Sequence, residues 1–236
     1  MRFKKTVSRA FSSAFDPLSL SPKIWLKSPI AGLNNGDAVT LWPDSSGNGH
    51  AFTITNATYE TNSQNGQSSV VTTGGANTGT GSALAWTLGE YSLYAVTKQQ
   101  FDYSSGMGIM QIGSGQAVSL SGYSGTDFGL AYGTNPSVNY VSVNPPSGTI
   151  TAFHVVNIRV PSSGTGIKAG LNGTDGSPVS IPGPDTPNTG THAPAIWFTI
   201  GTSFWGKSAD FFFFDYALNN TQHSNLITYL RTKWGI

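Results

Sequence analysis

Residues that could carry out acid–base or nucleophilic chemistry are few in this chain, and they are scattered. Glycoside hydrolysis needs two carboxylates flanking the scissile bond, whereas the chain has only two glutamates, Glu60 and Glu90, and no two aspartates close together on one expected strand. Cysteine is absent, which excludes thiolate zinc sites, disulfides and cysteine nucleophiles. The histidines show no metal-ligand spacing: His50, His154, His192 and His223. The sequence therefore predicts a protein that is not an enzyme, with no catalytic residue.

One short turn carries the oxygen ligands that calcium prefers. Between Asp44 and Asn48 the chain offers carboxylate, hydroxyl and amide oxygens, which suit a Ca²⁺ ion. The same residue types are those that a tight turn needs, because the Asp44 carboxylate can accept hydrogen bonds from the backbone amides of Ser46 or Gly47. We favour the structural interpretation, so no cofactor is expected, and Asp44 and Asn48 remain the only candidate metal ligands.

Aromatic side chains could bind sugars, because their rings can stack on the apolar faces of pyranoses much as they stack on one another. The chain has 13 Phe, 6 Trp and 9 Tyr, enough to fill a sizeable core, so most of these rings should be buried. Four of them fall in expected loops or near strand ends and are the candidate glycan-binding residues: Tyr103, Tyr123, Tyr132 and Trp205.

The elements that must position these groups are short β-strands. Apolar and polar residues alternate over 91–97 and 153–160, which is typical of strands. Asn-Gly pairs at 35–36, 48–49 and 172–173 mark tight turns. The polar stretch 60–82 is expected to be a long surface loop with one short strand at Val70 and Val71. About a dozen short strands with a single helix predict an all-β antiparallel sandwich.

One helix is expected, from Asn219 to Lys233. Asn219 or Asn220 can cap it, Leu226, Ile227 and Leu230 form an apolar stripe, and Gly235 follows as a stop. The run of rings from Phe211 to Phe214 should face both sides of one strand, so one side needs cover from this helix or from a neighbouring subunit. The pattern predicts a core that includes Trp25, Trp42, Leu93, Val155, Ile158, Phe212 or Phe213, and Leu230.

The first residues form a basic segment with a possible amphipathic spacing of four. We divide the chain into an N-terminal docking arm, residues 1–17, and a sandwich, residues 18–236. The residues expected to dock a partner are Arg2, Phe3, Lys4, Lys5, Val7, Arg9, Phe11 and Phe15. No apolar run of about 7–15 residues follows the basic start, so no secretory signal is expected, and no run of about 18 apolar residues predicts membrane insertion. The net charge of +1 argues against binding of nucleic acid.

Both ends of the chain carry family-like motifs. The opening Leu20-Ser-Pro-Lys-Ile-Trp-Leu26, the turn from Trp42 to Ala51, and the closing Asp215-Tyr-Ala-Leu218 with its helix and Trp234-Gly-Ile236 resemble the laminin-G-like branch of the concanavalin A-like lectin/glucanase superfamily. The resemblance is especially to small versions in bacteriophage structural proteins. It implies a concanavalin A-like antiparallel β-sandwich, or jelly roll. The Glu-x-Asp-x-x-Glu strand of the glucanases is missing here, as are the acids that often follow the first Trp of the family.

The resemblance implies a non-enzymatic virion protein, assembled in the host cytoplasm, that decorates or cements a capsid or belongs to a collar or tail fibre. Its partners would be other virion proteins and further copies of itself, as a homo-oligomer, with host surface polysaccharide as a candidate ligand. The first alternative is a carbohydrate-binding module of a bacterial extracellular protein. The second is a glycoside hydrolase, which the missing carboxylate pair disfavours.

Overall fold

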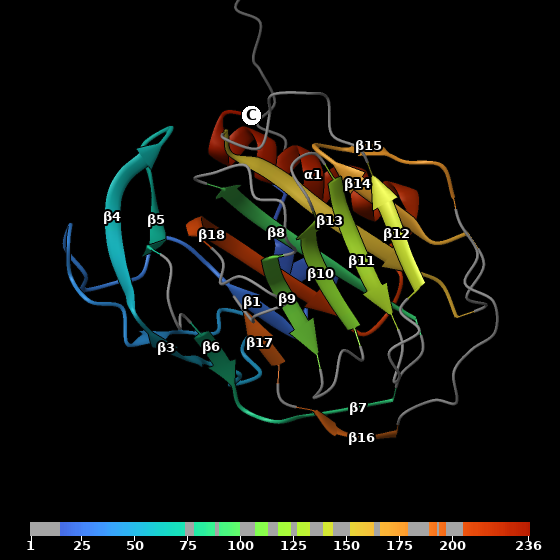
Figure 1. Ribbon diagram of the computed structural model, residues 1–236, viewed down its shortest axis with the longest axis horizontal. Helices are drawn as coiled ribbons and strands as arrows, with labels where there is room; N and C mark the ends of the chain where they lie inside the picture. The colour runs from blue at the N-terminus through green and yellow to red at the C-terminus, as the bar shows by residue number, and fades with distance from the viewer. Residues whose placement is uncertain are drawn as a thin grey trace, which may run out of the picture.

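The computed structural model describes residues 15–73, 78–87, 90–99, 107–112, 118–123, 127–132, 139–143, 152–162, 166–178, 189–192, 194–196 and 205–236. Within these ranges the chain forms two eight-stranded antiparallel sheets, a two-stranded ribbon, a short 3-10 helix at Pro17–Leu20 and one α-helix (Figure 1). This architecture confirms the predicted all-β antiparallel sandwich with a single C-terminal helix. No helix in the described ranges has the length and hydropathy needed to cross a membrane.

The first sheet, sheet A, has β18 near its centre. In spatial order it contains β15 (Thr174–Asp175), β14 (Lys168–Leu171), β13 (His154–Val160), β8 (Tyr91–Gln99), β18 (Trp205–Phe214), β5 (Gln67–Thr73) and β4 (Ala57–Gln64), with β1 (Ile24–Leu26) also pairing with β18.

The second sheet, sheet B, packs against one face of sheet A. In spatial order it contains β12 (Asn139–Val143), β11 (Asp127–Tyr132), β10 (Val118–Tyr123), β9 (Met107–Ile112), β17 (Pro194–Ile196), β6 (Thr78–Gly81), β3 (Phe52–Thr55) and β2 (Leu41–Trp42). The ribbon pairs β7 (Leu84–Thr87) with β16 (Thr189–His192).

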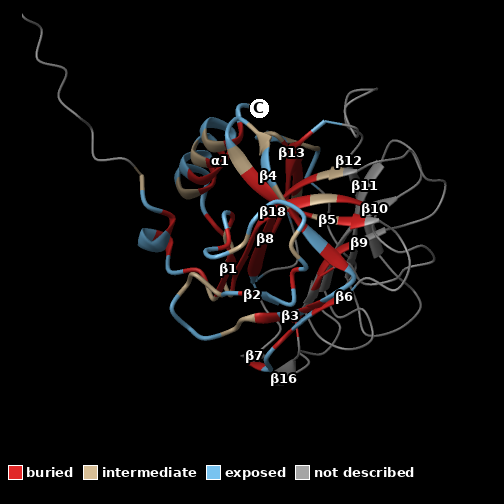
Figure 2. Cartoon of the chain, turned by 90° about the vertical axis from the view of Figure 1, so that its left-hand side faces the viewer, coloured by how far each residue is buried: buried red, intermediate tan, exposed pale blue. Residues whose placement is uncertain are grey.

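The central strands of sheet A are buried on both faces. Along β18, Phe211 and Phe213 belong to the core between the two sheets, whereas Phe212 and Phe214 belong to a second core beneath α1 (Asn220–Trp234). β13 is buried along its whole length. Figure 2 shows the result as three layers, with α1 at the left, β8 and β18 in the middle and β9 to β11 at the right. The helix therefore supplies the cover that the phenylalanine run requires.

The helix is capped as its sequence predicts. The Asn219 side chain accepts a hydrogen bond from the Gln222 amide and the Gln222 side chain accepts one from the Asn219 amide, which is a reciprocal capping box. Gly235 ends the helix in the left-handed conformation, with φ at 66°. Leu226, Leu230 and Trp234 are buried in the core beneath the helix.

The predicted loop over residues 60–82 is wrong, because three strands run through this region. β4 and β5 form a hairpin whose turn is Asn65-Gly66, with φ of 49° and 73°. This is the same Asn-Gly signal that marks other turns of the chain, and it was overlooked because the flanking residues are mostly Ser, Thr and Gln. β5 also pairs with β18. Its place beside a central strand, rather than its own propensity, makes it a strand.

Replacing Trp42 tests the packing of the core between the sheets. Its ring is fully buried, lies edge-on to Phe211 at 5.6 Å, and donates its Nε1–H to the Lys27 carbonyl at 3.0 Å. Trp42→Ala should lower the free energy of unfolding by about 3–5 kcal/mol because it empties a large buried site. The adjacent Leu41 is 53% exposed, so Leu41→Ala should change it by less than about 0.5 kcal/mol. Equal effects in urea denaturation would show that the assignment of faces is wrong.

Candidate functional site

The outer face of sheet B is the broad sheet surface that no described helix covers. In β3 the side chains of Phe52 and Ile54 are buried while Thr53 and Thr55 are exposed. In β6 the glycines take the inward positions: a Cβ at Gly79 would lie 2.4 Å from the Ile196 side chain. The Thr-Gly-Thr-Gly sequence of β6 must therefore turn its threonines outward, because its inward positions have room only for glycine.

Strand register extends the line of backbone positions that begins at Leu41 and Thr53 across the whole sheet. From Leu41 and Thr53, the Cα pairings lead to Thr80 and onward through every strand to β12. The complete set, which we call the cross-strand row, is Leu41, Thr53, Thr80, Ala195, Gln111, Ser119, Ala131 and Tyr140. The row contains no charged residue, and seven strand spacings of about 4.8 Å give it a length of about 34 Å.

Hydroxyl groups accompany the row on the described strands. Thr55 pairs with Thr78 one step along the same face, and their Oγ1 atoms lie 3.0 Å apart. Exposed hydroxyls can both donate and accept hydrogen bonds. In β3 and β6 the face therefore offers a polar but uncharged surface.

The four aromatic residues predicted to bind glycans do not converge at one place in the backbone. Tyr123 pairs with Asp127 at one end of the β10–β11 ladder, whereas Tyr132 lies at its opposite end. Trp205 begins β18 in the other sheet, opposite Thr73. The side chains of these three residues, and Tyr103 altogether, lie outside the described part of the chain. Their role in glycan binding remains a prediction, and the cross-strand row was not foreseen because it exists only once the register is known.

The turn at Asp44 has the geometry of a structural turn. Asp44 Oδ1 accepts hydrogen bonds from the Trp25 and Ser46 amides at 3.0 and 2.9 Å. Its Oδ2 accepts from Ser46 Oγ at 2.7 Å and from the His50 amide at 3.0 Å. Asn48 Nδ2 donates to the Pro22 carbonyl at 3.0 Å. Both carboxylate oxygens are thus engaged in joining β1 to the β2–β3 connection, which supports the structural interpretation over a Ca²⁺ site.

Within the ranges that the structure describes, no three or more His, Cys, Asp or Glu side chains are close enough together to hold a metal ion.

Of the predicted docking residues, only Phe15 belongs to the described part of the chain. Its ring lies edge-on to Tyr229 of α1, with ring centroids 6.2 Å apart. Burial raises the pKa of Tyr229 to about 12. The described part of the chain therefore begins beside the helix. The remaining residues lie outside the described ranges: Arg2, Phe3, Lys4, Lys5, Val7, Arg9 and Phe11.

A buried polar cluster holds the N-terminal half of α1 to sheet A. His223 Nδ1 lies 2.8 Å from the Tyr94 hydroxyl, and its Nε2 lies 3.8 Å from Asp175 Oδ1. Arg159 forms an ion pair with Asp175 Oδ2, and its Nη1 donates to Asn220 Oδ1 at 3.0 Å. The sequence signal for this cluster was the pair of polar residues, Asn157 and Arg159, on the strand face that also carries Val155. Tyr94 and His223 are buried, so this cluster serves packing rather than contact with a ligand.

A second buried cluster holds the other end of the helix. The Asp210 carboxylate is fully buried and accepts hydrogen bonds from Trp25 Nε1 at 3.2 Å and from Trp234 Nε1 at 2.8 Å. Lys233 Nζ lies 2.9 Å from Asp210 Oδ2 and donates to the Ser28 carbonyl at 2.6 Å. Burial raises the pKa of Asp210, while Lys233 and the two indole donors lower it. This carboxylate is fixed by structural partners, as is Glu60, which pairs with Lys207 at 2.6 Å.

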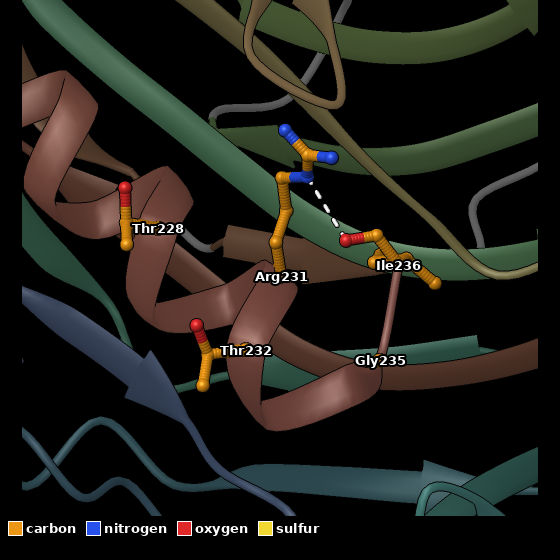
Figure 3. Close-up of a pocket in the computed structure, with 5 residues that line it drawn as sticks. All are labelled: Thr228, Arg231, Thr232, Gly235 and Ile236. Carbon is orange, nitrogen blue, oxygen red and sulfur yellow. Dashed lines mark hydrogen bonds between the residues drawn. The ribbon is translucent and has the colours of Figure 1, made fainter.

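An open pocket lies at the C-terminal end of α1 (Figure 3). It has a volume of about 300 Å³ and is lined by Thr228, Arg231, Thr232, Gly235 and Ile236. Arg231 Nε donates to the Ile236 carbonyl at 2.9 Å, which places the guanidinium beside the last residue, as Figure 3 shows. The pocket thus combines one cation and two hydroxyl groups with the main-chain oxygen of Ile236.

No protein-family model matches this sequence, and no curated protein is significantly similar to it. Solved structures do share its fold. The binding domain of botulinum neurotoxin DC in complex with rat synaptotagmin II is 11% identical with a TM-score of 0.62, over 90% of this chain and 52% of that chain. Trypanosoma rangeli sialidase in complex with sialic acid is 13% identical with a TM-score of 0.58, over 87% and 34%.

A third structure matches over most of its own length. Domain 4 of AbnA, an extracellular arabinanase from Geobacillus stearothermophilus in complex with arabinotriose, is 18% identical with a TM-score of 0.60, over 78% of this chain and 91% of that one. The chain spans about half the length of the botulinum structure and a third of the sialidase. At these identities the similarity establishes the sandwich fold alone.

The His223 cluster predicts a pH dependence of stability. Burial, assisted by the charge of Arg159, lowers the pKa of His223 to about 4. In the unfolded chain His223 takes up a proton near pH 6.5, whereas in the folded chain it does not. Its contribution to the free energy of unfolding is therefore fully present above about pH 6.5 and decreases as the pH falls towards 4. His223→Gln should reduce the slope of the free energy of unfolding against pH by the equivalent of up to about one bound proton. Urea titrations between pH 7 and 4.5 measure this slope.

His50 provides the control for that measurement, because it is only partly buried. His50→Gln should retain the wild-type pH dependence. If His223→Gln and the wild-type protein gave parallel curves, the pKa of His223 would be the same in the folded and unfolded states, which contradicts its buried placement.

Proposed function

We propose that this chain is a non-enzymatic, lectin-like domain that binds glycans on the outer face of sheet B. The observation that carries the proposal is the cross-strand row, an uncharged line of residues that crosses all eight strands of the sheet. Where its side chains are described, they are exposed and include Thr53 and Thr80. Hydroxyl groups on a rigid sheet can exchange hydrogen bonds with sugar hydroxyls without first becoming ordered.

The absence of charge in the row favours a neutral sugar chain, and its length of about 34 Å suits an extended segment of several sugar units. Structures with the same fold include one titled as a complex with sialic acid and one as a complex with arabinotriose. These titles support sugar binding as a use of the fold.

Two observations support the non-enzymatic part of the proposal. The chain has only two glutamates, and Glu60 is held by Lys207. Asp44 and Asp210 are fully engaged by structural donors, and Asp175 is paired with Arg159. These carboxylates are committed to holding the fold, whereas glycoside hydrolysis needs a free pair facing the sugar.

In its finer form, the proposal is that the chain is a bacteriophage virion protein whose arm is bound to another virion protein. It would decorate or cement a capsid, or belong to a collar or a tail fibre. The resemblance of the chain ends to phage proteins supports it, as do the basic arm and the lack of cysteine, since proteins assembled in a reducing cytoplasm rarely use disulfides. The contact of Phe15 with Tyr229 of α1 supports an arm that begins on the helix side, away from sheet B. An arm bound to the particle would therefore leave the glycan face directed outward.

A carbohydrate-binding module of a bacterial extracellular protein is the second candidate. The match to AbnA domain 4 favours it, because it covers 91% of a domain whose title assigns it to an extracellular arabinanase. Both candidates share the same sheet face and differ in what the arm joins.

A glycan array tests the shared part of the proposal. Thr80→Lys places a long charged side chain on the third strand of the row, so it should reduce binding to the recognised neutral glycans by at least about tenfold. Thr58 is an exposed threonine of β4 in sheet A, and Thr58→Lys is the matched control that should keep wild-type binding. Loss of binding in both variants, or in neither, would contradict the assignment of the site to sheet B.

Deletion of residues 1–15 tests the virion form of the proposal. The shortened protein should fold with the wild-type circular dichroism spectrum but fail to join particles, because it has lost both the basic residues and the apolar anchor. Docking by the full arm should resist moderate salt, since buried apolar contacts are not screened. Normal incorporation of the shortened protein, measured on purified particles, would show that the arm is not the anchor.

A further inference from the structure

A group of buried polar atoms beside α1 has no hydrogen-bond partner within the described part of the chain. It consists of both amide atoms of Asn157, Nε of Arg159 and Oδ1 of Asp175. Asn157 is only 1% exposed, so bulk water does not reach its amide. Buried polar atoms are almost always paired with protein groups or with ordered water, because an unpaired one destabilises the fold. These atoms therefore indicate a bound partner.

The Asn157 amide and the Asp175 carboxylate meet above Gly170. Strand pairing places Asn157 opposite Gly170, and Gly170 opposite Asp175, in one row across β13, β14 and β15 (Figure 1). A Cβ on Gly170 would lie 2.7 Å from Asn157 Oδ1 and 3.0 Å from Asp175 Oδ1. Two unpaired oxygen atoms thus approach the same point from the two strands that flank β14, and the glycine leaves room for them to do so.

Water fits the chemistry of these atoms better than an ion does. The group offers two acceptors, Asn157 Oδ1 and Asp175 Oδ1, and two donors, Asn157 Nδ2 and Arg159 Nε. A water molecule can donate two hydrogen bonds and accept two, so it can pair with both kinds of atom. A cation would be repelled by Arg159 and by Lys168, whose Nζ lies 3.8 Å from Asp175 Oδ2. An anion would be repelled by the Asp175 carboxylate itself.

Asp175 connects this group of atoms to solvent and to the helix. Its side chain is 24% exposed, whereas that of Arg159 is 6% exposed, so water can enter past the carboxylate. His223 Nε2 lies 3.8 Å from Asp175 Oδ1, which is too long for a hydrogen bond but within reach of a bridging water. A water on Asp175 Oδ1 therefore extends the contact between sheet A and α1.

We infer that this group of atoms binds an ordered internal water molecule, held by the Asn157 amide and the Asp175 carboxylate above Gly170. The Arg159 guanidinium, which is paired with Asp175 Oδ2, keeps the carboxylate in position. The water joins β13 to β15, which is only two residues long, and so stabilises the end of sheet A on which the N-terminal half of α1 packs. An internal water of this kind is part of the packed structure. The inference is independent of the proposed glycan binding.

A crystal structure of the full chain and a count of internal waters in solution test the inference together. The electron density should show one water within about 3.2 Å of the Asn157 amide and of Asp175 Oδ1. Oxygen-17 magnetic relaxation dispersion counts the water molecules that stay bound for longer than the protein takes to tumble. Asn157→Leu, which keeps the size of the side chain but removes both amide atoms, should lower this count by one.

Gln64→Leu is the matched control, because it removes an amide on β4 that is only partly buried, and it should leave the count unchanged. A direct hydrogen bond between the Asn157 amide and the Asp175 carboxylate, with no water beside them, would overturn the inference. An equal count of long-lived waters in the wild type and in Asn157→Leu would overturn it too. If Asn157→Leu does not fold, the crystal structure of the wild type decides alone.

Discussion

The burial of both faces of the central strands of sheet A is the constraint on which the rest of the structure depends. β18 alternates its phenylalanines between two cores, so the strand can be stable only if both sides are covered. One cover is sheet B and the other is α1. At about 25 cal/mol per Å² of buried apolar area, the rings beneath the helix represent a substantial part of the marginal stability of a domain. The helix is therefore an integral layer of the fold.

Two buried polar clusters determine where that layer sits. At one end, Asp210 binds the indoles of Trp25 and Trp234 and the ammonium group of Lys233. At the other, His223 lies between Tyr94 and Asp175. A buried charge is costly unless its partners are in place, so these contacts define one position for α1 among the many that apolar packing alone would permit. Because the helix covers one face of sheet A, the sheet surface that no described helix covers is the outer face of sheet B. The division into a closed side and an open side is the physical basis of the proposed function.

Local signals in the sequence predicted the sandwich, the helix and the core. Asn219 and Gly235 mark the helix ends through capping chemistry, and the alternation over Phe153 to Val160 assigns its faces correctly. Long-range features could not be predicted in this way. The strands through residues 60–82 owe their structure to pairing with β18, and the cross-strand row requires the register of eight strands. The meeting of Tyr94 with His223 joins residues 129 positions apart. The candidate sites were thus predicted by residue type, whereas their grouping depends on the tertiary fold.

The most direct test of the account is amide hydrogen exchange of the full chain, with and without the neutral glycan that binds most tightly on an array. Binding across the outer face of sheet B should slow exchange in β3 and β6, residues 52–55 and 78–81, and leave β13 and α1 unchanged. Protection confined to α1 and the strands of sheet A, with none in β3 and β6, would contradict the placement of the glycan site on sheet B.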